Sequence, residues 1–111
     1  SNAYTATMMQ STYFQSGLPM LLQNGYNQKL SGDVLFALQP GVIVYGPKGT
    51  THGSGYSYDT HVPLLFYGNG INNGISYEPT SVTDIAPTIS ALLGISFPSG
   101  ATGTVIEKVI Y

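Results

Sequence analysis

The sequence has 111 residues, no cysteine and a net charge of −2, and only 7% of its residues are charged. Three lysines without arginine are too few for a nucleic-acid or anionic-membrane surface, and no apolar run reaches the roughly 20 residues of a membrane span. The absence of cysteine excludes disulfides and thiolate metal sites. A free-standing domain has about 25% charged residues. This composition therefore predicts that much of the surface is buried against polypeptide outside this sequence.

The length suits one domain. Ser1-Asn2-Ala3 reads as a remnant of expression-tag cleavage, so residues 1–3 are left out of the predicted fold. Residues 4–111 remain as one continuous piece of a domain. We expect the natural protein to be longer than this sequence.

Residues 5–24 carry apolar side chains at roughly helical spacing. Gly17 and Pro19 interrupt the run. Ser16 can cap a new helix that tolerates Pro19 in its first turn. The segment therefore predicts two short helices or one broken helix.

Four later stretches are typical of strands. Residues 33–38 predict a buried strand, and residues 42–45 predict a shorter strand that pairs with it as a hairpin. Residues 61–68 predict another buried strand, and residues 104–111 a final one.

The clearest predicted helix covers residues 83–93, where Thr83 or Asp84 can cap the first turn and Gly94 ends the last. The apolar stripe of this helix comprises Ile85, Ile89, Leu92 and Leu93. Because helices alternate with strands, the sequence predicts an α/β or α+β piece with a small sheet. The edges of such a sheet are exposed.

The fifteen residues 46–60 form a loop rich in glycine and hydroxyl side chains, which indicates function or disorder. His52 lies in this loop between small residues that allow a metal ion close approach. On residues alone, a metal ligand and a solvent-exposed histidine both stay open for His52. Asp59 can ligate a metal, orient His52 or cap the loop, and capping is favoured. For His61 a structural role is favoured.

Three segments resemble the alkaline phosphatase superfamily. Residues 49–68, Gly-Thr-Thr-His-Gly-Ser-Gly-Tyr-Ser-Tyr-Asp-Thr-His-Val-Pro-Leu-Leu-Phe-Tyr-Gly, resemble its last metal-ligand segment. Residues 24–34 resemble the lead-in to a core strand, and residues 83–95 resemble the closing helix. The match looks closest to the bacterial alkaline phosphatases with a threonine nucleophile, which are similar to the nucleotide pyrophosphatase/phosphodiesterases. Gly55 departs from this branch, which often has proline there.

The resemblance implies an α/β fold, here a carboxy-terminal fragment of a helix-sandwiched sheet with two to four strands and two to three helices. It implies that His52 ligates one of two zinc ions, and it implies no ligand role for His61. The nucleophile and the other ligands are expected in earlier sequence. The parent is expected to be a periplasmic or secreted phosphate-ester hydrolase, and this fragment to be inactive alone.

Other interpretations remain open. The parent could be a sulfatase or phosphonate hydrolase of the same superfamily, or a degenerate scaffold without catalysis. The chain could instead be a complete small binding or interaction module. We also expect its unpaired strand edges to promote self-association.

Overall fold

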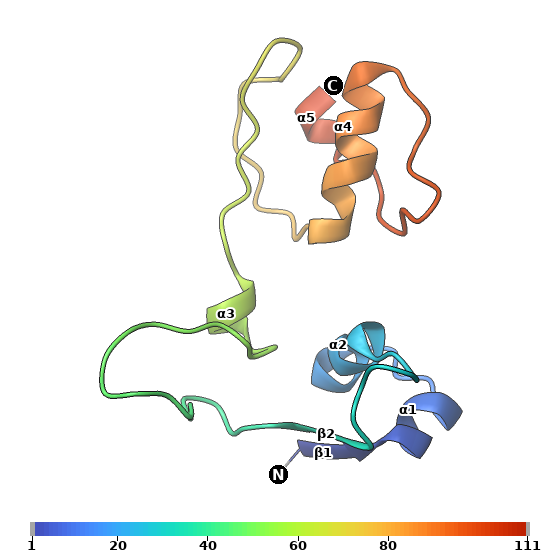
Figure 1. Cartoon of the computed structure of the whole chain (residues 1–111). Helices are drawn as coiled ribbons and strands as arrows, with labels where there is room; N and C mark the ends of the chain where they lie inside the picture. The colour runs from blue at the N-terminus through green and yellow to red at the C-terminus, as the bar shows by residue number, and fades with distance from the viewer. Residues whose placement is uncertain (1, 111) are drawn as a thin grey trace. The chain divides into compact units, whose positions relative to one another are not determined.

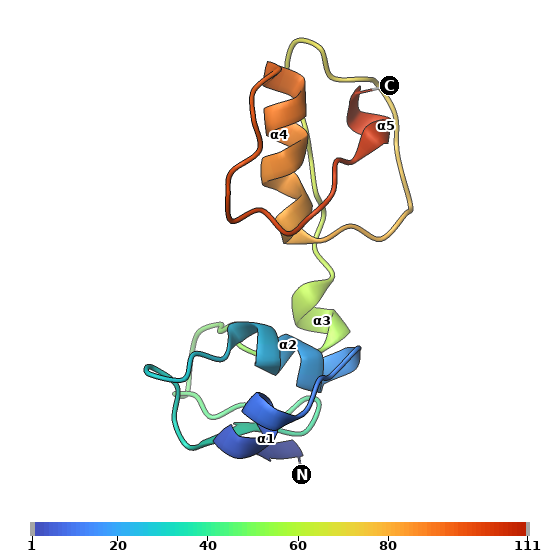
Figure 2. The same ribbon diagram turned by 90° about the vertical axis from the view of Figure 1, so that its right-hand side faces the viewer.

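The structure is a computed structural model that describes residues 2–110. The chain divides into two compact units, one up to Pro63 and one from Leu64 onward. Figures 1 and 2 show the elements of each unit. No helix among the described residues has the length and apolar character needed to cross a bilayer.

The first unit contains two helices at its start, which confirms the prediction for residues 5–24. α1 covers Ala6–Ser11, and α2 covers Gly17–Gly25 with Ser16 at its N-cap. The side-chain amide of Gln23 ties the two together. It donates to the carbonyl oxygens of Met9 at 2.7 Å and Thr12 at 2.6 Å, so a polar side chain fixes the break between the helices.

The sheet of this unit is an antiparallel pair of strands, β1 (Asn2–Thr5) and β2 (Val34–Ala37). Asn2 lies opposite Ala37, and Thr5 lies opposite Val34. The predicted strand at residues 33–38 is confirmed, but its predicted burial is wrong, because Val34 and Phe36 are exposed. Residues Asn2 and Ala3, which the sequence analysis left out of the fold, belong to the sheet.

The predicted hairpin between residues 33–38 and 42–45 is wrong. Residues 42–45 form no strand, and the Val42 amide instead donates to the Gln39 carbonyl at 3.0 Å in a turn. The partner of β2 is β1, roughly 30 residues earlier in the chain. Sequence reasoning favours the nearest apolar run as the strand partner, whereas the partner in the structure is a segment more distant in the chain.

The second unit is built around one helix. η1 (Val82–Asp84) is a 3₁₀ turn that leads into α4 (Ile85–Leu93), and Gly94 ends α4 with a φ of 63°. The predicted helix at residues 83–93 is thus confirmed. α5 (Glu107–Ile110) replaces the final strand predicted for residues 104–111. Residues 61–68 are not a strand either, because the described chain offers them no strand partner.

The side of α4 that faces its own unit is not the predicted apolar stripe. Pro87, Thr88 and Ser90 are buried, whereas Ile89 and Leu93 are 43% and 66% exposed. Thr88 is buried because its hydroxyl donates to the Asp84 carbonyl at 2.6 Å and accepts from the Ile106 amide at 2.9 Å. Pro87 and Thr88 are the most fully buried side chains, and the bond from the Ile106 amide ties this side of α4 to the returning chain.

The observed class agrees with the α/β expectation. The described residues contain two strands, within the predicted range, and five α-helices where two to three were expected. The two helices that the sequence analysis did not predict, α3 and α5, have four residues each, which is too short for a periodic pattern to reveal.

Candidate functional site

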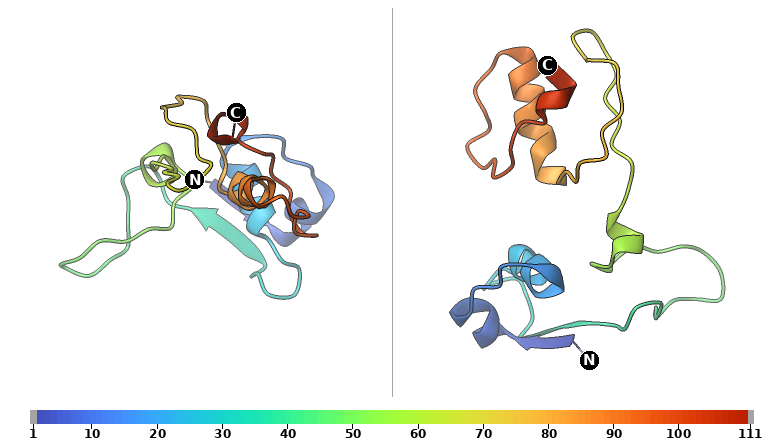
Figure 3. Two further views of the ribbon diagram at one scale, coloured as in Figure 1. Left: turned by 90° about the horizontal axis from the view of Figure 1, so that it is seen from above. Right: turned by 180° about the vertical axis from the view of Figure 1, so that it is seen from behind.

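The loop that carries His52 runs from the end of β2 to α3 (Ser57–Thr60) in the first unit. Residues 39–53 are exposed, and His52 is among them. Figure 3 shows this long connection from two sides. An exposed imidazole in a glycine-rich loop is free to meet a ligand that comes from outside the unit.

Two tyrosines fasten the base of the loop. The Tyr56 hydroxyl donates to the Leu38 carbonyl at 2.8 Å, and the Gly41 amide donates to the Tyr58 hydroxyl at 3.1 Å. The two rings stack with their centroids 5.8 Å apart. The start and the end of the loop are therefore joined, and His52 lies between the two anchors. The spacing of these tyrosines does not show their hydrogen-bond partners, which only the fold reveals.

Asp59 holds the second half of the loop. Its Oδ2 accepts from the Ser54 amide at 3.1 Å and also from the Ser54 hydroxyl. The favoured interpretation of Asp59 as a loop cap is confirmed, since its bonds go to Ser54 and not to His52. His61 caps the end of α3, where its amide donates to the Ser57 carbonyl at 2.9 Å.

Glycines set the backbone beside His52. Gly53 has a φ of 137°, a conformation that side chains disfavour. Gly55 packs against α2, where an added Cβ would lie 2.7 Å from Leu18 Cδ1 and 3.1 Å from Leu21 Cδ1. The departure from proline at this position therefore changes packing as well as stiffness. Together these residues hold the loop against α2 and leave the imidazole exposed.

The donors present do not form a metal site by themselves. Among residues 2–110, no three His, Cys, Asp or Glu side chains are grouped closely enough to hold an ion. A catalytic zinc takes three protein ligands. His52 can supply one of them, so any metal bound here needs further donors from elsewhere.

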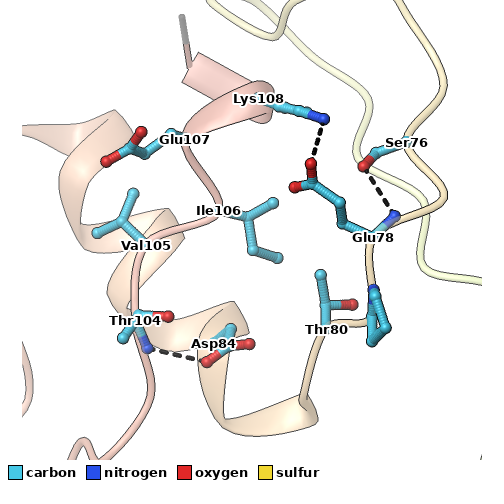
Figure 4. Close-up of a pocket in the computed structure, with 10 residues that line it drawn as sticks. Ser76, Glu78, Thr80, Asp84, Thr104, Val105, Ile106, Glu107 and Lys108 are labelled. Atoms are coloured by element: carbon cyan, nitrogen blue, oxygen red, sulfur yellow. Dashed lines mark hydrogen bonds and ion pairs between the residues drawn. The ribbon is translucent and has the colours of Figure 1, made fainter.

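A hollow of about 410 Å³ in the second unit is a weaker candidate (Figure 4). The Lys108 ammonium pairs with Glu78 at 2.6 Å, so these two charges neutralise each other. Asp84 Oδ2 accepts from the Ser81 amide and Oδ1 from the Thr104 amide, each at 2.8 Å. These backbone hydrogen bonds lower the pKa of Asp84 below its ordinary value of 3.8. Asp84 therefore completes a capping box with Ser81 at the start of η1, and its side chain makes no capping bond to the first turn of α4, which corrects the predicted helix cap.

Relatives and solved structures share this fold and sequence. The chain is 54% identical over 88 residues to alkaline phosphatase PafA of Elizabethkingia meningoseptica, a match that covers 78% of the chain and 16% of PafA. It is 44% identical over 87 residues to alkaline phosphatase PhoV of Synechococcus elongatus, covering 78% of the chain and 16% of PhoV. A protein of Myroides odoratus named calcium-transporting ATPase is 44% identical over 102 residues, covering 86% and 19%.

A crystal structure of wild-type PafA matches 98% of the chain with a TM-score of 0.88 and 44% identity. The predicted resemblance is therefore confirmed, and the chain corresponds to a segment of alkaline phosphatase superfamily proteins. It spans only 21% of the PafA chain in that structure and 16 to 19% of these three curated relatives. No known family profile matches the chain.

Proposed function

We propose that this chain is a carboxy-terminal part of a zinc-dependent phosphate-ester hydrolase and supplies one metal ligand, His52. The observation that carries the proposal is the exposed His52 loop within a segment that is 54% identical to an alkaline phosphatase. An alignment that covers 78% of the chain must include the central residues, His52 among them, wherever it begins.

The loop geometry supports this role. Tyr56 and Tyr58 close its base, Asp59 fixes Ser54, and none of these contacts uses the His52 imidazole. The side chain is thus positioned by its neighbours while its two nitrogens stay available. A bound zinc ion would polarise a phosphoryl oxygen and lower the pKa of an attacking hydroxyl or water. The remaining ligands and the nucleophile would come from polypeptide outside this sequence.

The test uses a chimera of PafA in which this chain replaces the corresponding segment. We expect the chimera to hydrolyse p-nitrophenyl phosphate with zinc present. His52→Ala should lower that activity by at least about 100-fold, because residues that merely orient metal ligands already cost about 10–100-fold. It should also reduce the bound zinc measured by atomic spectroscopy. The isolated chain, with one histidine donor, should show neither activity nor tight zinc binding.

His61→Ala is the matched control. His61 is also an exposed histidine of this loop region, and it contributes its backbone amide to the end of α3. Its substitution should leave activity and zinc content nearly unchanged. Unchanged activity and zinc content in His52→Ala would contradict the ligand role, whatever the chimera hydrolyses.

A second candidate follows from the Myroides odoratus relative, whose name describes calcium transport driven by ATP. Both candidate enzymes hydrolyse a bond to a phosphate group. They differ in the substrate that carries this group and in the ion required. The natural full-length protein, and not the chimera, is therefore assayed with p-nitrophenyl phosphate, with ATP in the presence of calcium and with p-nitrophenyl sulfate, because the nucleophile and the remaining ligands lie outside this sequence. Preference for p-nitrophenyl phosphate favours the phosphatase; preference for ATP with calcium, or for the sulfate ester, favours the corresponding alternative.

For the whole protein we further propose a place in the periplasm or outside the cell. This proposal rests on the resemblance to the bacterial alkaline phosphatases. Fractionation of cells that express the natural gene would test it, because activity confined to the cytoplasm would contradict an exported enzyme.

A further inference from the structure

One face of the β1–β2 ribbon in the first unit is apolar and uncovered. Residues that lie directly opposite each other share a face, so Thr5 and Val34 lie on the same side as Ala3 and Phe36. All four are exposed, Val34 by 58% and Phe36 by 68%. The other side carries Tyr4 and Leu35, which are partly buried, and Tyr4 packs edge-to-face on Phe14.

The sequence of β2 indicates what this face requires. Val34–Ala37 is apolar at every position, whereas a strand with one solvated face alternates apolar and polar residues. In the parallel sheets of α/β proteins, strands with a continuous apolar sequence are covered on both faces. Figures 1 and 3 show α2 on one side of the ribbon, and no described element of this unit covers the other side.

A second uncovered surface lies on α4 in the other unit. The nine residues of α4 include no charged side chain. Ala86, Ile89 and Leu93 recur at the i, i+3 and i+7 positions of one side, and all three are exposed. A helix without charges on any side is typical of a position surrounded by protein. We call the ribbon face and this α4 stripe the two apolar faces.

The size of the exposed surface agrees with a missing partner. The chain exposes 9023 Å². A compact monomer of 11.8 kDa exposes about 5,900 Å², and two separate compact bodies of half that mass expose about 7,100 Å². The chain exceeds the second value by roughly 1,900 Å², which is more than one partner contributes to a standard interface and is typical of obligate association.

We infer that the two apolar faces bind the remaining body of an alkaline phosphatase polypeptide, so that this chain and a phosphatase that lacks the matching segment assemble in trans. The matching segment is 21% of the PafA chain, and the other four fifths of that protein provide a body with which this fold occurs. The inference rests on the proposed function only for the choice of partner, because the faces themselves are properties of this chain.

A second copy of the chain is the competing occupant. A two-fold dimer buries the same patch on both copies, so that patch must be complementary to itself. A large body can cover both faces, because its contact patches need not be identical. Both faces lack charged side chains, which is typical of the buried core of a permanent interface.

The experiment co-expresses this chain with PafA from which the corresponding segment has been deleted. Light scattering after size-exclusion chromatography should show a one-to-one complex, and intact PafA should bind none of the chain. A self-associated chain that persists beside the body, a monomeric chain, or a body that stays insoluble during co-expression would overturn the inference.

Two substitutions on the faces test which surface is used. Phe36→Asp and Leu93→Asp change side chains that are mostly exposed in this chain, so circular dichroism of the isolated chain should stay unchanged. Each should weaken the complex at least about 30-fold, the loss typical of a central interface residue. Tyr77→Asp is the control, because Tyr77 is 93% exposed and lies outside both faces. Equal weakening by all three variants would contradict binding through these faces.

The PafA chimera gives an independent measurement that does not need a truncated protein to fold. Covalent labelling read by mass spectrometry should modify Phe36 and Leu93 in the isolated chain and leave both protected in the chimera. Equal labelling in the two proteins would overturn the inference. A complex or a protected chimera without phosphatase activity would support the docking surface while contradicting the proposed function.

Discussion

Gly103 shows how a single residue fixes the second unit. A Cβ built at this position would collide with the carbonyl group of Thr83 and would lie 2.6 Å from the Asp84 amide nitrogen. Both contacts are backbone atoms, which cannot move aside as the end of a side chain can. The close approach brings residues 103–106 beside α4. There the Thr104 amide donates a hydrogen bond to Asp84, and the Ile106 amide donates one to Thr88.

Gly103→Ala should therefore destabilise the chain by about 2–3 kcal/mol, the upper part of the range for overpacked sites. The free energy of unfolding can be measured by urea titration of the isolated chain. Gly100→Ala is the matched control, because nothing lies within 4 Å of a Cβ built there. A stability of Gly103→Ala equal to that of the control would show that the backbones do not approach as described.

At the scale of elements, Asp84 and Thr88 join α4 to the segment that returns beside it. Asp84 accepts amide hydrogens from Ser81 before the helix and Thr104 after it, and Thr88 accepts one from Ile106. The bond from Ile106 accounts for the burial of Thr88, whereas Ile89 and Leu93 of the apolar stripe are exposed. In the first unit Gln23 has the equivalent role between α1 and α2.

The stability of the second unit should fall in acid because of Asp84. Its pKa in the folded chain lies below the ordinary 3.8, owing to the Ser81 and Thr104 backbone bonds. A lowered folded pKa stabilises the fold fully above the ordinary value, and this contribution is lost as the pH falls through the lowered value. Asp84→Asn should be less stable than the wild type at pH 7, and the difference should shrink below pH 3.8.

Thermal unfolding followed by circular dichroism at pH 7 and at acid pH would measure this difference. Glu107→Gln is the control, an exposed carboxylate of the same unit. The difference in thermal stability between Glu107→Gln and the wild type should remain small at both pH values. If the stability difference between Asp84→Asn and the wild type became larger in acid, it would change in the direction opposite to that expected for a carboxylate held in its ionised form.

For the whole molecule, the amount of surface that folding removes from water decides the cooperativity. Unfolding a compact monomer of this mass exposes about 11,200 Å². This chain starts from 9023 Å² and exposes about 8,100 Å². Of the large hydrophobic side chains that the structure describes, only Met9 is buried. The isolated chain should therefore unfold with weak dependence on denaturant.

Its urea m-value should be about a quarter below that of compact 111-residue domains, since the m-value scales with the surface exposed on unfolding. Equilibrium unfolding at several protein concentrations would measure it. A normal m-value that does not change with concentration would mean that the chain buries more surface than described. A value that rises with concentration would indicate self-association.

Local sequence alone determined the local features of this protein. The start of α2 after Ser16, the strand at β2 and the helix ended by Gly94 all depend on residues that are neighbours in the chain. The motif around His52, together with the motifs before and after it, also identified the superfamily, because residue types in a fixed order can be recognised even in a short segment.

Only the tertiary structure decided the pairing and the burial. β2 pairs with β1 rather than with residues 42–45, and α4 turns Thr88 inward rather than Ile89. Tyr56 and Tyr58 gained roles from partners that the spacing does not show. The physical reason is the same in each case: a strand partner and a buried face are chosen by distant backbone donors and acceptors, and local periodicity contains no information about them.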